Sequence, residues 1–402
     1  MKKIKKISNC SICNGKIVKA LNLGMHPLCD DLIKINSKKI SQEYPVNIYY
    51  CKVCIIAYQR FIVDKKILFP KTYHYRGKLT KDVVNGQAEL VKDIKKKFKN
   101  IKYKNVLDIG CNDGALLDFF RKEKCRTIGV EPTNAALDAS KKHKIYNQYF
   151  DEKLAREIKK KFKKIDFITF TNVFAHINDL GKLLKALKIL LTDTTTVIVE
   201  NHYLGSIIRL KQFDSFYHEH PRTYSLQSLI QIGKKISMKI SNVSFPKRYG
   251  GNIRVIFEKE TSKKFTTLIK KEYLFFNSLK RLKNDIWKWR IKKRKLIKKL
   301  VKKFGPLPAK AFPGRAAILI KLLNLSDRHI SAVYEQPNSK KISYYVPGTR
   351  IKIISDIYLK KNLKEKIPII NLAWHISSEI RKYLKLNKIK SKIIDIVNNK
   401  DF

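Results

Sequence analysis

The chain has 402 residues, 44% of them hydrophobic, which is enough for the cores of two or three globular domains. Its 87 Lys and Arg residues outweigh 33 Asp and Glu residues, giving a net charge of +54. Lysine is spread along the whole chain without a helix-turn-helix, RRM or finger pattern, so the charge favours compositional bias over a nucleic-acid footprint. No apolar run of membrane-spanning or signal-peptide length occurs, so we expect no membrane partner and a cytoplasmic location.

Two C-x-x-C pairs near the N-terminus form the first motif. Cys10 and Cys13 make one pair, and Cys51 and Cys54 make the other after 37 intervening residues. Each pair presents two thiolates from one tight turn, and two pairs complete a tetrahedral zinc site without an open position. We therefore expect structural Zn²⁺ in a reducing compartment, although four thiolates also suit iron. The other cysteines are interpreted as ordinary buried thiols: Cys29, Cys111 and Cys125.

An aromatic, loop-like stretch over residues 69–77 separates this zinc module from the next predicted strand. The stretch includes Tyr75. Two interpretations remain open for it, an interdomain linker and a lid over a bound cofactor.

Residues 105–117 predict a buried strand, a glycine turn and the start of a helix. Gly110 and Gly114 allow a ligand to approach the backbone closely. The next strand, residues 126–132, ends in Glu131, 21 residues after Gly110, where an acid can accept both ribose hydroxyls of an adenosine group. These features alone would also suit NAD.

The order of residues in this turn separates the two cofactors. Asp108 lies inside the strand end, and Asp-x-Gly-x-x-x-Gly resembles motif I of class I S-adenosylmethionine methyltransferases. Dehydrogenases carry G-x-G-x-x-G instead. We therefore expect S-adenosylmethionine as the cofactor.

Two further buried strands are predicted, over residues 165–177 and 195–201. The first contains His176, which alone fits a packing or capping role as well as a catalytic one. Residues 217–220 then concentrate four hydrogen-bonding side chains, Tyr-His-Glu-His. In an extended segment the two histidines share one face, where they suit metal binding or general-base catalysis near neutral pH.

At this point the chain resembles the nucleotide-sugar C-methyltransferase family, whose members methylate C3 of a dTDP-4-keto-deoxysugar. The resemblance covers almost the whole length, and the four-cysteine start together with the Tyr-His-Glu-His box is its most specific part. The supporting segments are residues 23–28, the donor motif at 105–117, and residues 172–176, 249–254, 345–349 and 372–375.

The resemblance implies residue roles as well as a reaction. A proton beside a ketone is acidic only when the enolate is stabilised, so the family needs a base at C3 and donors near the C4 oxygen. By motif position His220 is the expected base, while Tyr217, Glu219 and His176 position the sugar or stabilise the enolate. The implied cofactor-binding residues are Tyr75, Asp108, Gly110, Asn112, Gly114, Glu131 and Asn172.

The C-terminal third begins with an amphipathic helix or helix pair over residues 262–304, ended by Gly305-Pro306. Apolar runs beyond it suggest a small α/β domain, which in the family is a second Rossmann-like unit that helps to hold the nucleotide sugar. Here the turn at residues 312–316 lacks the fuller glycine pattern. Glu335 also stands where the family usually has an aspartate, so the sugar and the nucleotide (dTDP or GDP) stay open.

The expected fold class is therefore α/β, with a class I methyltransferase Rossmann-like central domain, a small N-terminal zinc module and a C-terminal Rossmann-like domain. The expected domains are a zinc-binding domain (1–68), the methyltransferase domain (69–258), a helical connector (259–305) and a C-terminal substrate-binding domain (306–402). Two alternatives remain open: an O-methyltransferase on another small acceptor, and a zinc-containing protein that binds or methylates nucleic acid. The partner we expect is a nucleotide sugar, not nucleic acid, and the oligomeric state is left open.

Overall fold

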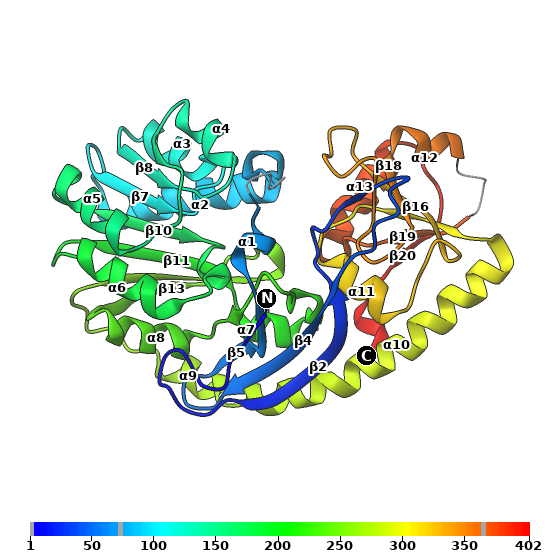
Figure 1. Ribbon diagram of the computed structural model, residues 1–402, viewed down its shortest axis with the longest axis horizontal. Coiled ribbons are helices and arrows are strands. Elements are labelled where there is room, and N and C mark those ends of the chain that lie inside the picture. Colours follow the sequence, from blue (N-terminus) through cyan, green and yellow to red (C-terminus); the bar gives the residue numbers. More distant parts are fainter. Residues whose placement is uncertain (1–3, 71–74, 363–366) are drawn as a thin grey trace. The chain divides into compact units, whose positions relative to one another are not determined.

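The computed structural model describes residues 4–70, 75–362 and 367–402. The chain divides into two compact units, each built from segments that are separate in sequence (Figure 1). Unit 1 comprises residues 1–19, 49–209 and 219–276, and unit 2 comprises residues 20–48, 210–218 and 277–402. No helix within the described residues is long and apolar enough to cross a membrane.

Unit 1 is built on a seven-stranded sheet with the order β13-β14-β11-β10-β7-β8-β9. Its strands from β7 to β11 pair in parallel, and β14 pairs antiparallel with both of its neighbours, β11 and β13. This order and the single reversed strand are those of a class I methyltransferase sheet. The strands are β7 (Asn105–Ile109), β8 (Arg126–Val130), β9 (Lys144–Tyr146), β10 (Phe167–Thr171), β11 (Thr196–His202), β13 (Lys239–Ser244) and β14 (Asn252–Glu258).

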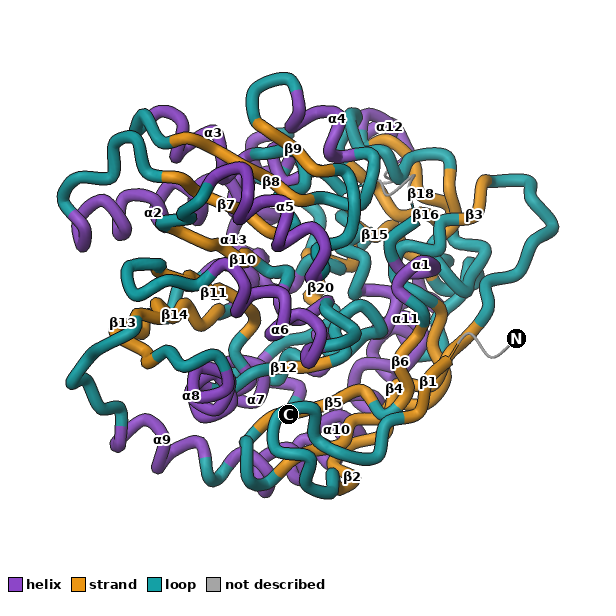
Figure 2. Tube along the Cα trace, turned by 60° about the vertical axis from the view of Figure 1, so that its left-hand side comes forward, coloured by secondary structure: helices purple, strands orange, loops and turns teal. Residues whose placement is uncertain are grey.

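Helices cover both faces of this sheet, because successive strand residues point to opposite sides. Val106 joins an apolar cluster with residues of α2 and α3, whereas its neighbour Leu107 joins the cluster that contains residues of α5, α6 and α8. Figure 2 draws these helices in purple and the strands of the sheet in orange. Asp151, Asp179 and Ser225 cap α5, α6 and α8 by accepting backbone N–H groups. The helices of the sheet are α2 (Lys81–Phe98), α3 (Ala115–Lys122), α4 (Ala135–Ser140), α5 (Glu152–Phe162), α6 (Leu180–Leu190), α7 (Leu204–Arg209) and α8 (Leu226–Lys235).

The N-terminal module is made almost entirely of β-strands. β1 pairs antiparallel with β6, and a second sheet has the order β12-β5-β4-β2. The chain leaves unit 1 along β2 and returns to it along β4. The strands are β1 (Ile4–Lys6), β2 (Val18–Pro27), β4 (Glu43–Cys51), β5 (Ile56–Gln59), β6 (Phe61–Val63) and β12 (Arg222–Thr223), followed by helix α1 (Lys65–Leu68).

Unit 2 contains a second seven-stranded sheet, of order β20-β19-β15-β16-β18-β17-β3. Its first five strands pair in parallel, while β17 and β3 add an antiparallel edge. The strands are β3 (Ile33–Lys34), β15 (Leu307–Lys310), β16 (Ile330–Glu335), β17 (Tyr344–Tyr345), β18 (Lys352–Ser355), β19 (Ile369–Asn371) and β20 (Ile393–Asp395). The helices are α11 (Ala316–Leu322), α12 (Ile357–Asn362) and α13 (Ser377–Leu386).

The predicted amphipathic segment is confirmed as a helix pair, α9 (Thr266–Glu272) and α10 (Phe275–Phe304). Gly305 ends α10 in a left-handed conformation, with φ of 76°. Trp289 of α10 is fully buried, and its indole N–H donates to the Ile396 carbonyl at 2.8 Å.

Short 3-10 turns complete the described structure: η1 (Gly77–Leu79), η2 (Phe174–His176), η3 (Phe213–Ser215), η4 (Arg248–Gly250), η5 (Trp374–Ile376) and η6 (Asn399–Asp401). The predicted α/β class, with its methyltransferase sheet, N-terminal module and C-terminal α/β sheet, is confirmed.

Candidate active site and zinc site

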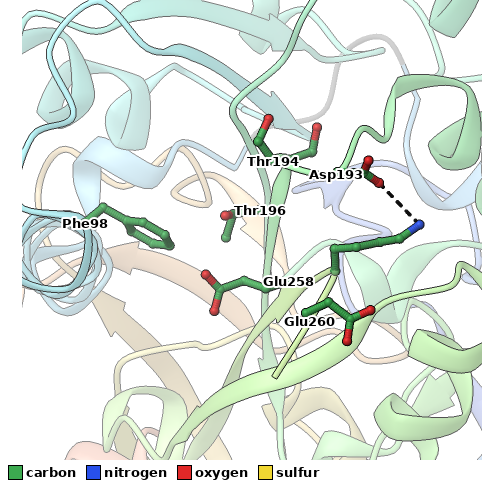
Figure 3. A pocket seen from close by; sticks show the side chains of 8 residues that line it. Phe98, Asp193, Thr194, Thr196, Glu258 and Glu260 are labelled. Carbon is green, nitrogen blue, oxygen red and sulfur yellow. Dashed lines mark ion pairs between the residues drawn. The ribbon is translucent and has the colours of Figure 1, made fainter. Parts of the chain in front are cut away.

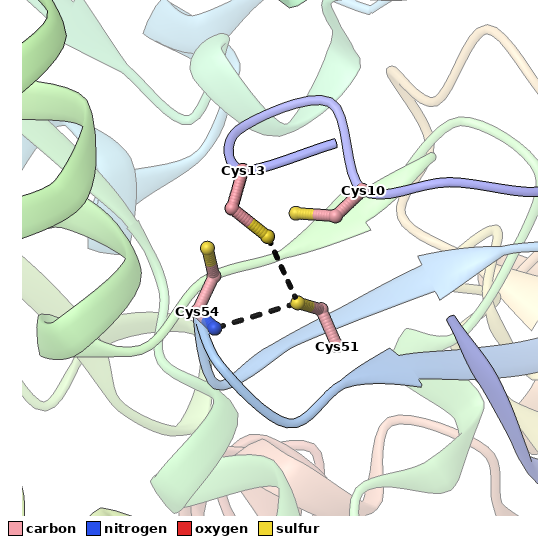
Figure 4. A group of neighbouring side chains, drawn as sticks. All are labelled: Cys10, Cys13, Cys51 and Cys54. Carbon is pink, nitrogen blue, oxygen red and sulfur yellow. Dashed lines mark hydrogen bonds between the residues drawn. The ribbon is translucent and has the colours of Figure 1, made fainter. Parts of the chain in front are cut away.

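The four predicted metal ligands come together in unit 1 (Figure 4). The Sγ atoms of Cys10, Cys13, Cys51 and Cys54 all lie within 4.8 Å of one another. The Cys13 and Cys51 sulfurs are 3.6 Å apart, close to the sulfur–sulfur edge of about 3.8 Å that a tetrahedron with 2.3 Å Zn–S bonds requires. Among the described residues, no other group of His, Cys, Asp or Glu side chains meets the same ligand spacing.

The backbone supports thiolates at this site. The Ile12 N–H points to the Cys10 sulfur and the Cys54 N–H to the Cys51 sulfur, each at 3.4 Å. The four cysteine sulfurs therefore fit Zn²⁺ as ligands. These residues would hold the ion with no coordination position left for a substrate. The three remaining cysteines are buried, as predicted.

We call residues 110–114, between β7 and α3, the donor turn. This turn lies at the carboxyl edge of the unit 1 sheet, where ligands of open α/β sheets bind. Gly110 and Gly114 both have φ of 77°, which favours glycine. A Cβ at Gly110 would lie 2.4 Å from Cγ2 of Val173, so packing requires glycine there as well. The predicted close approach of a ligand to these two glycines stays a prediction.

Asp108 occupies a buried position inside the strand end. It is 1% exposed and its Oδ1 accepts a hydrogen bond from the Thr169 hydroxyl at 2.7 Å. Burial raises the pKa of Asp108 to about 7, and the negative charge of Glu131 adds to the increase. The side chain therefore links the end of β7 to β10.

Glu131 directly follows β8, and its carboxylate organises the same turn. Its Oε2 accepts the Asn112 N–H at 3.0 Å, and its Oε1 accepts the N–H and hydroxyl of Thr133 at 2.9 and 2.7 Å. A carboxylate has about four acceptor positions, so within the described residues one position on Oε2 remains for a ribose hydroxyl. The fit to an adenosine-containing donor rests on this acceptor.

The described end of the aromatic stretch is attached to the donor turn. The Asn112 side chain donates to the Tyr75 carbonyl at 3.2 Å and accepts the Gly77 N–H at 3.0 Å. The Lys78 N–H donates to Asp113 at 2.8 Å. These contacts join the end of the stretch to the turn after β7, and the linker and lid interpretations both stay predictions. Residues 71–74 of the stretch lie outside the described residues.

Asn172 follows β10, which ends at Thr171 rather than continuing through the predicted segment at 165–177. The residue has a φ of 55°, so the chain turns there into η2. Its backbone N–H donates to the Glu200 carbonyl at 2.7 Å, and its side-chain oxygen accepts from Asn252 at 3.1 Å. Asn172 thus ends the strand and fixes the start of the turn that carries His176.

Three histidines of unit 1 meet near this turn, and we call His176, His202 and His220 the imidazole cluster. The rings of His176 and His220 have centroids 4.9 Å apart, and those of His202 and His220 are 5.2 Å apart at 87°. His176 Nδ1 lies 2.7 Å from the Glu219 carbonyl, so this nitrogen carries the proton. Burial lowers the pKa of His176, which favours its neutral form.

His202 was missed by the sequence interpretation. A usable signal was present: it ends β11, the strand beside β10, directly after Glu200 and Asn201. Polar residues at the carboxyl ends of neighbouring parallel strands gather at one edge of the sheet.

The predicted extended form of residues 217–220 is wrong, because the segment after η3 is a tight bend. The two histidines therefore do not form a pair on one face. His218 belongs to unit 2, where its Nε2 lies 3.1 Å from the Tyr44 carbonyl, and burial lowers its pKa to about 4. Tyr217 also belongs to unit 2, whereas Glu219 and His220 belong to unit 1.

A buried ion network lies beside this edge of the sheet. Glu200 is fully buried and its two carboxylate oxygens pair with Arg248 at 2.5 Å and Arg254 at 2.7 Å. Arg254 also pairs with Asp93 of α2 at 2.5 Å. Because Glu200 immediately precedes Asn201 and His202, the network holds the carboxyl end of β11 in place.

A pocket at the opposite end of the same sheet contains none of the candidate residues (Figure 3). Thr196 begins β11 and Glu258 ends the antiparallel β14, so the pocket opens at the amino edge of the parallel strands. Its lining residues are Phe98, Asp193, Thr194, Thr195, Thr196, Glu258, Lys259 and Glu260.

Three domain-family models match consecutive parts of the chain. Residues 10–69 match a family described as "Putative zinc binding domain", and residues 84–237 match a methyltransferase domain. Residues 247–396 match a C-methyltransferase C-terminal domain. Together these parts cover most of the sequence.

Individual relatives are more distant. C-methyltransferase NovU of Streptomyces niveus is 23% identical over 256 residues, a match that spans 63% of this chain and only 61% of NovU. The ubiquinone biosynthesis O-methyltransferase of Pelagibacter ubique (strain HTCC1062) is 28% identical over 187 residues, covering 42% of this chain and 75% of that protein.

Among solved structures, an S-adenosylmethionine-dependent methyltransferase from Archaeoglobus fulgidus is 17% identical, covering 43% of this chain and 94% of its own. The TM-score between the two structures is 0.34. The chain therefore combines, in this order, parts that match a putative zinc-binding domain, a methyltransferase domain and a C-methyltransferase C-terminal domain.

Proposed function

We propose that this protein transfers a methyl group from S-adenosylmethionine to C3 of a nucleotide-linked 4-keto-deoxysugar, through an enolate formed by a protein base. The observation that carries the proposal is the packing of His176 against His220, with ring centroids 4.9 Å apart, in a chain with a C-methyltransferase C-terminal domain. Alkylation of carbon requires a base, whereas a hydroxyl acceptor is already nucleophilic once its proton is shared.

His220 is the proposed base. A neutral imidazole ring has one unprotonated nitrogen, which can accept the C3 proton. His176 is held in its neutral form by burial, with Nδ1–H directed to the Glu219 carbonyl. Tyr217 and Glu219 are proposed to position the sugar or stabilise the enolate oxygen.

The donor site is proposed at the carboxyl edge of the unit 1 sheet. S-adenosylmethionine, when bound, supplies a methyl group on a positively charged sulfur. Glu131 would accept a ribose hydroxyl at the remaining position on Oε2, Asp108 would support the turn, and the segment at Tyr75 would close over the adenosine. The proposed donor-binding set is Tyr75, Asp108, Gly110, Asn112, Gly114, Glu131 and Asn172.

The remaining assignments belong to the same proposal. The C-terminal α/β sheet would help to hold a dTDP- or GDP-linked sugar, and four reduced thiols at the zinc site suit a cytoplasmic location. The proposal also divides the chain into four parts: the zinc-binding domain (1–68), the methyltransferase domain (69–258), the helical connector (259–305) and the C-terminal substrate-binding domain (306–402).

The test is to incubate the purified protein with S-adenosylmethionine and a panel of dTDP- and GDP-4-keto-deoxysugars in heavy water. Mass spectrometry then follows methyl transfer and deuterium at C3. We expect both signals with at least one sugar, and we expect both to disappear in His220→Ala. Donor binding without either signal across the panel would contradict carbon alkylation of these sugars.

One observation favours a second candidate, an O-methyltransferase acting on another small acceptor. The relative from Pelagibacter ubique is described as an O-methyltransferase and shares 28% identity over 187 residues. Methylation of a hydroxyl acceptor that survives in His220→Ala, without exchange at any carbon, would support this candidate.

A further inference from the structure

His202 is placed beside the proposed base by the carboxyl end of β11. It is the last residue of β11, where its Cα pairs with that of Asn252 in β14. The preceding residue, Asn201, accepts the Ala175 N–H at 3.2 Å, and so fixes the turn that carries His176. One strand end therefore positions two of the three rings of the imidazole cluster.

The two rings that flank His220 differ in the hydrogen bonds that their nitrogen atoms make. His176 is half-buried, and its Nδ1 is committed to the Glu219 carbonyl at 2.7 Å. His202 is likewise half-buried, whereas His220 is 8% exposed. The 5.2 Å between the centroids of His202 and His220 leaves room for a nitrogen-to-nitrogen hydrogen bond of about 2.9 Å between their edges.

Carbon methylation creates a need for such a neighbour. The C3–H bond breaks and its proton goes to His220, while the electron pair becomes the enolate. That pair then forms the C3–CH3 bond, and the C–S electron pair stays on sulfur as a neutral thioether. One proton is therefore left on the enzyme at each turnover and must reach solvent before the base can act again.

We propose that His202 relays this proton, receiving it from His220 and releasing it to solvent. This inference rests on the proposed function, because it needs a proton taken from carbon. A shared metal does not explain the cluster, since within the described chain only the four cysteines have the ligand spacing of a metal site. In this relay His202 is a proton-transfer neighbour that need not touch the substrate.

The relay has a signature that separates it from simple packing. With the sugar and S-adenosylhomocysteine bound, deuterium enters C3 only when the proton on His220 exchanges with solvent before it returns to carbon. Without a relay the same proton returns, so exchange slows although deprotonation continues. Methyl transfer in a single turnover needs no proton release and is expected to persist.

The experiment compares wild type with His202→Phe, which keeps an aromatic ring but has no nitrogen to carry a proton. We expect C3 exchange in heavy water to fall about tenfold or more, and single-turnover methylation to stay within about twofold of wild type. His329→Phe is the matched control, since His329 is a half-buried histidine of unit 2, and it should change neither rate.

A second variant keeps the test decisive if the phenylalanine disturbs the fold. In His202→Ala, free imidazole added to the buffer should restore exchange and leave methylation unchanged. Equal losses of exchange and methylation in both variants, or no loss in either, would overturn the relay alone. A wild-type protein that shows neither reaction would instead overturn the proposed function on which the relay depends.

Discussion

The two seven-stranded sheets of this protein each contain a strand-turn-helix-strand unit with parallel strands, and the two turns carry different residues. In both, an amide of the turn donates to the acid that ends or follows the second strand: Asn112 to Glu131 in unit 1, and Phe312 to Glu335 in unit 2. The last charged residue of the first strand is Asp108 in unit 1, the penultimate residue of β7, which accepts a hydrogen bond from a threonine. In unit 2 it is Lys310, which is buried in an ion pair.

The backbone of the two turns differs as well. The unit 1 turn has two glycines in the left-handed region, whereas the unit 2 turn has Ala311 there, with φ of 63°. The first turn thus combines two glycines with a carboxylate acceptor, and the second combines a left-handed alanine with a buried ion pair. The same chain path therefore supports different chemistry, and the identity of a site depends on the residues placed on it.

The largest expected effect comes from the ion pair of the unit 2 turn. Lys310 Nζ lies 2.6 Å from Asp356, and both side chains are almost fully buried. Lys310→Ala leaves a buried carboxylate without its cation, which should lower the free energy of unfolding by about 3–5 kcal/mol. Urea denaturation measures the loss.

Lys239→Ala is the control for this change, because Lys239 and Glu260 form an exposed pair at 2.6 Å. An exposed pair contributes only about 0–1 kcal/mol. Similar losses in the two variants would show that the strand end of unit 2 does not depend on its buried charge.

In unit 1, Asp108 near the end of β7 should make the free energy of unfolding depend on pH. The pKa of Asp108 is raised by burial to about 7, above its value of about 4 in an unfolded chain. The stabilisation from its bound proton is therefore complete below about pH 4 and is lost as the pH rises through about 7.

Asp108→Asn keeps a polar side chain beside Thr169 but cannot titrate. Wild type should lose about 3 kcal/mol more than this variant between about pH 5 and about pH 8, measured by denaturation at each pH. Asp193→Asn changes an exposed carboxyl of the same unit and should leave the wild-type slope in place. Parallel pH curves for wild type and Asp108→Asn would refute the raised pKa.

The smallest expected effect distinguishes the two acids. Glu131→Gln removes a charged acceptor from the proposed ribose site, so affinity for S-adenosylhomocysteine should fall about tenfold to hundredfold by calorimetric titration. Glu335→Gln is the matched change in unit 2 and should leave that affinity within about twofold. Equal effects of the two variants would remove the distinction between the turns.

The sequence predicted the parts of the fold whose signal is local. The strand, glycine turn and helix at residues 105–117 and the amphipathic pair ending at Gly305 were predictable from apolar periodicity and glycine. The two C-x-x-C pairs predicted that the four cysteines come together, because each pair brings two ligands from a single turn.

The rest depends on contacts that no local pattern encodes. β3 consists of only Ile33 and Lys34, so it has no measurable period, and its partner β17 lies about 300 residues later. The bend at residues 217–220 and the packing of His202 against His220 likewise depend on tertiary structure. Site residues such as His202 can be predicted from polar residues at the ends of neighbouring strands, but not from their spacing along the chain.

The pairing of β3 with β17 also has a consequence for synthesis of the chain. Ile33 lies opposite Tyr345, so the ribosome must add about 310 residues between the two, which takes about 15–60 s at 5–20 residues per second. Throughout this interval the second sheet lacks its antiparallel edge. The chain also passes between the two units five times, so neither unit can be completed from one uninterrupted stretch of nascent chain. Only a nearly finished polypeptide contains every strand of both sheets, and fragments cut at any single point should remain dependent on chaperones or aggregate.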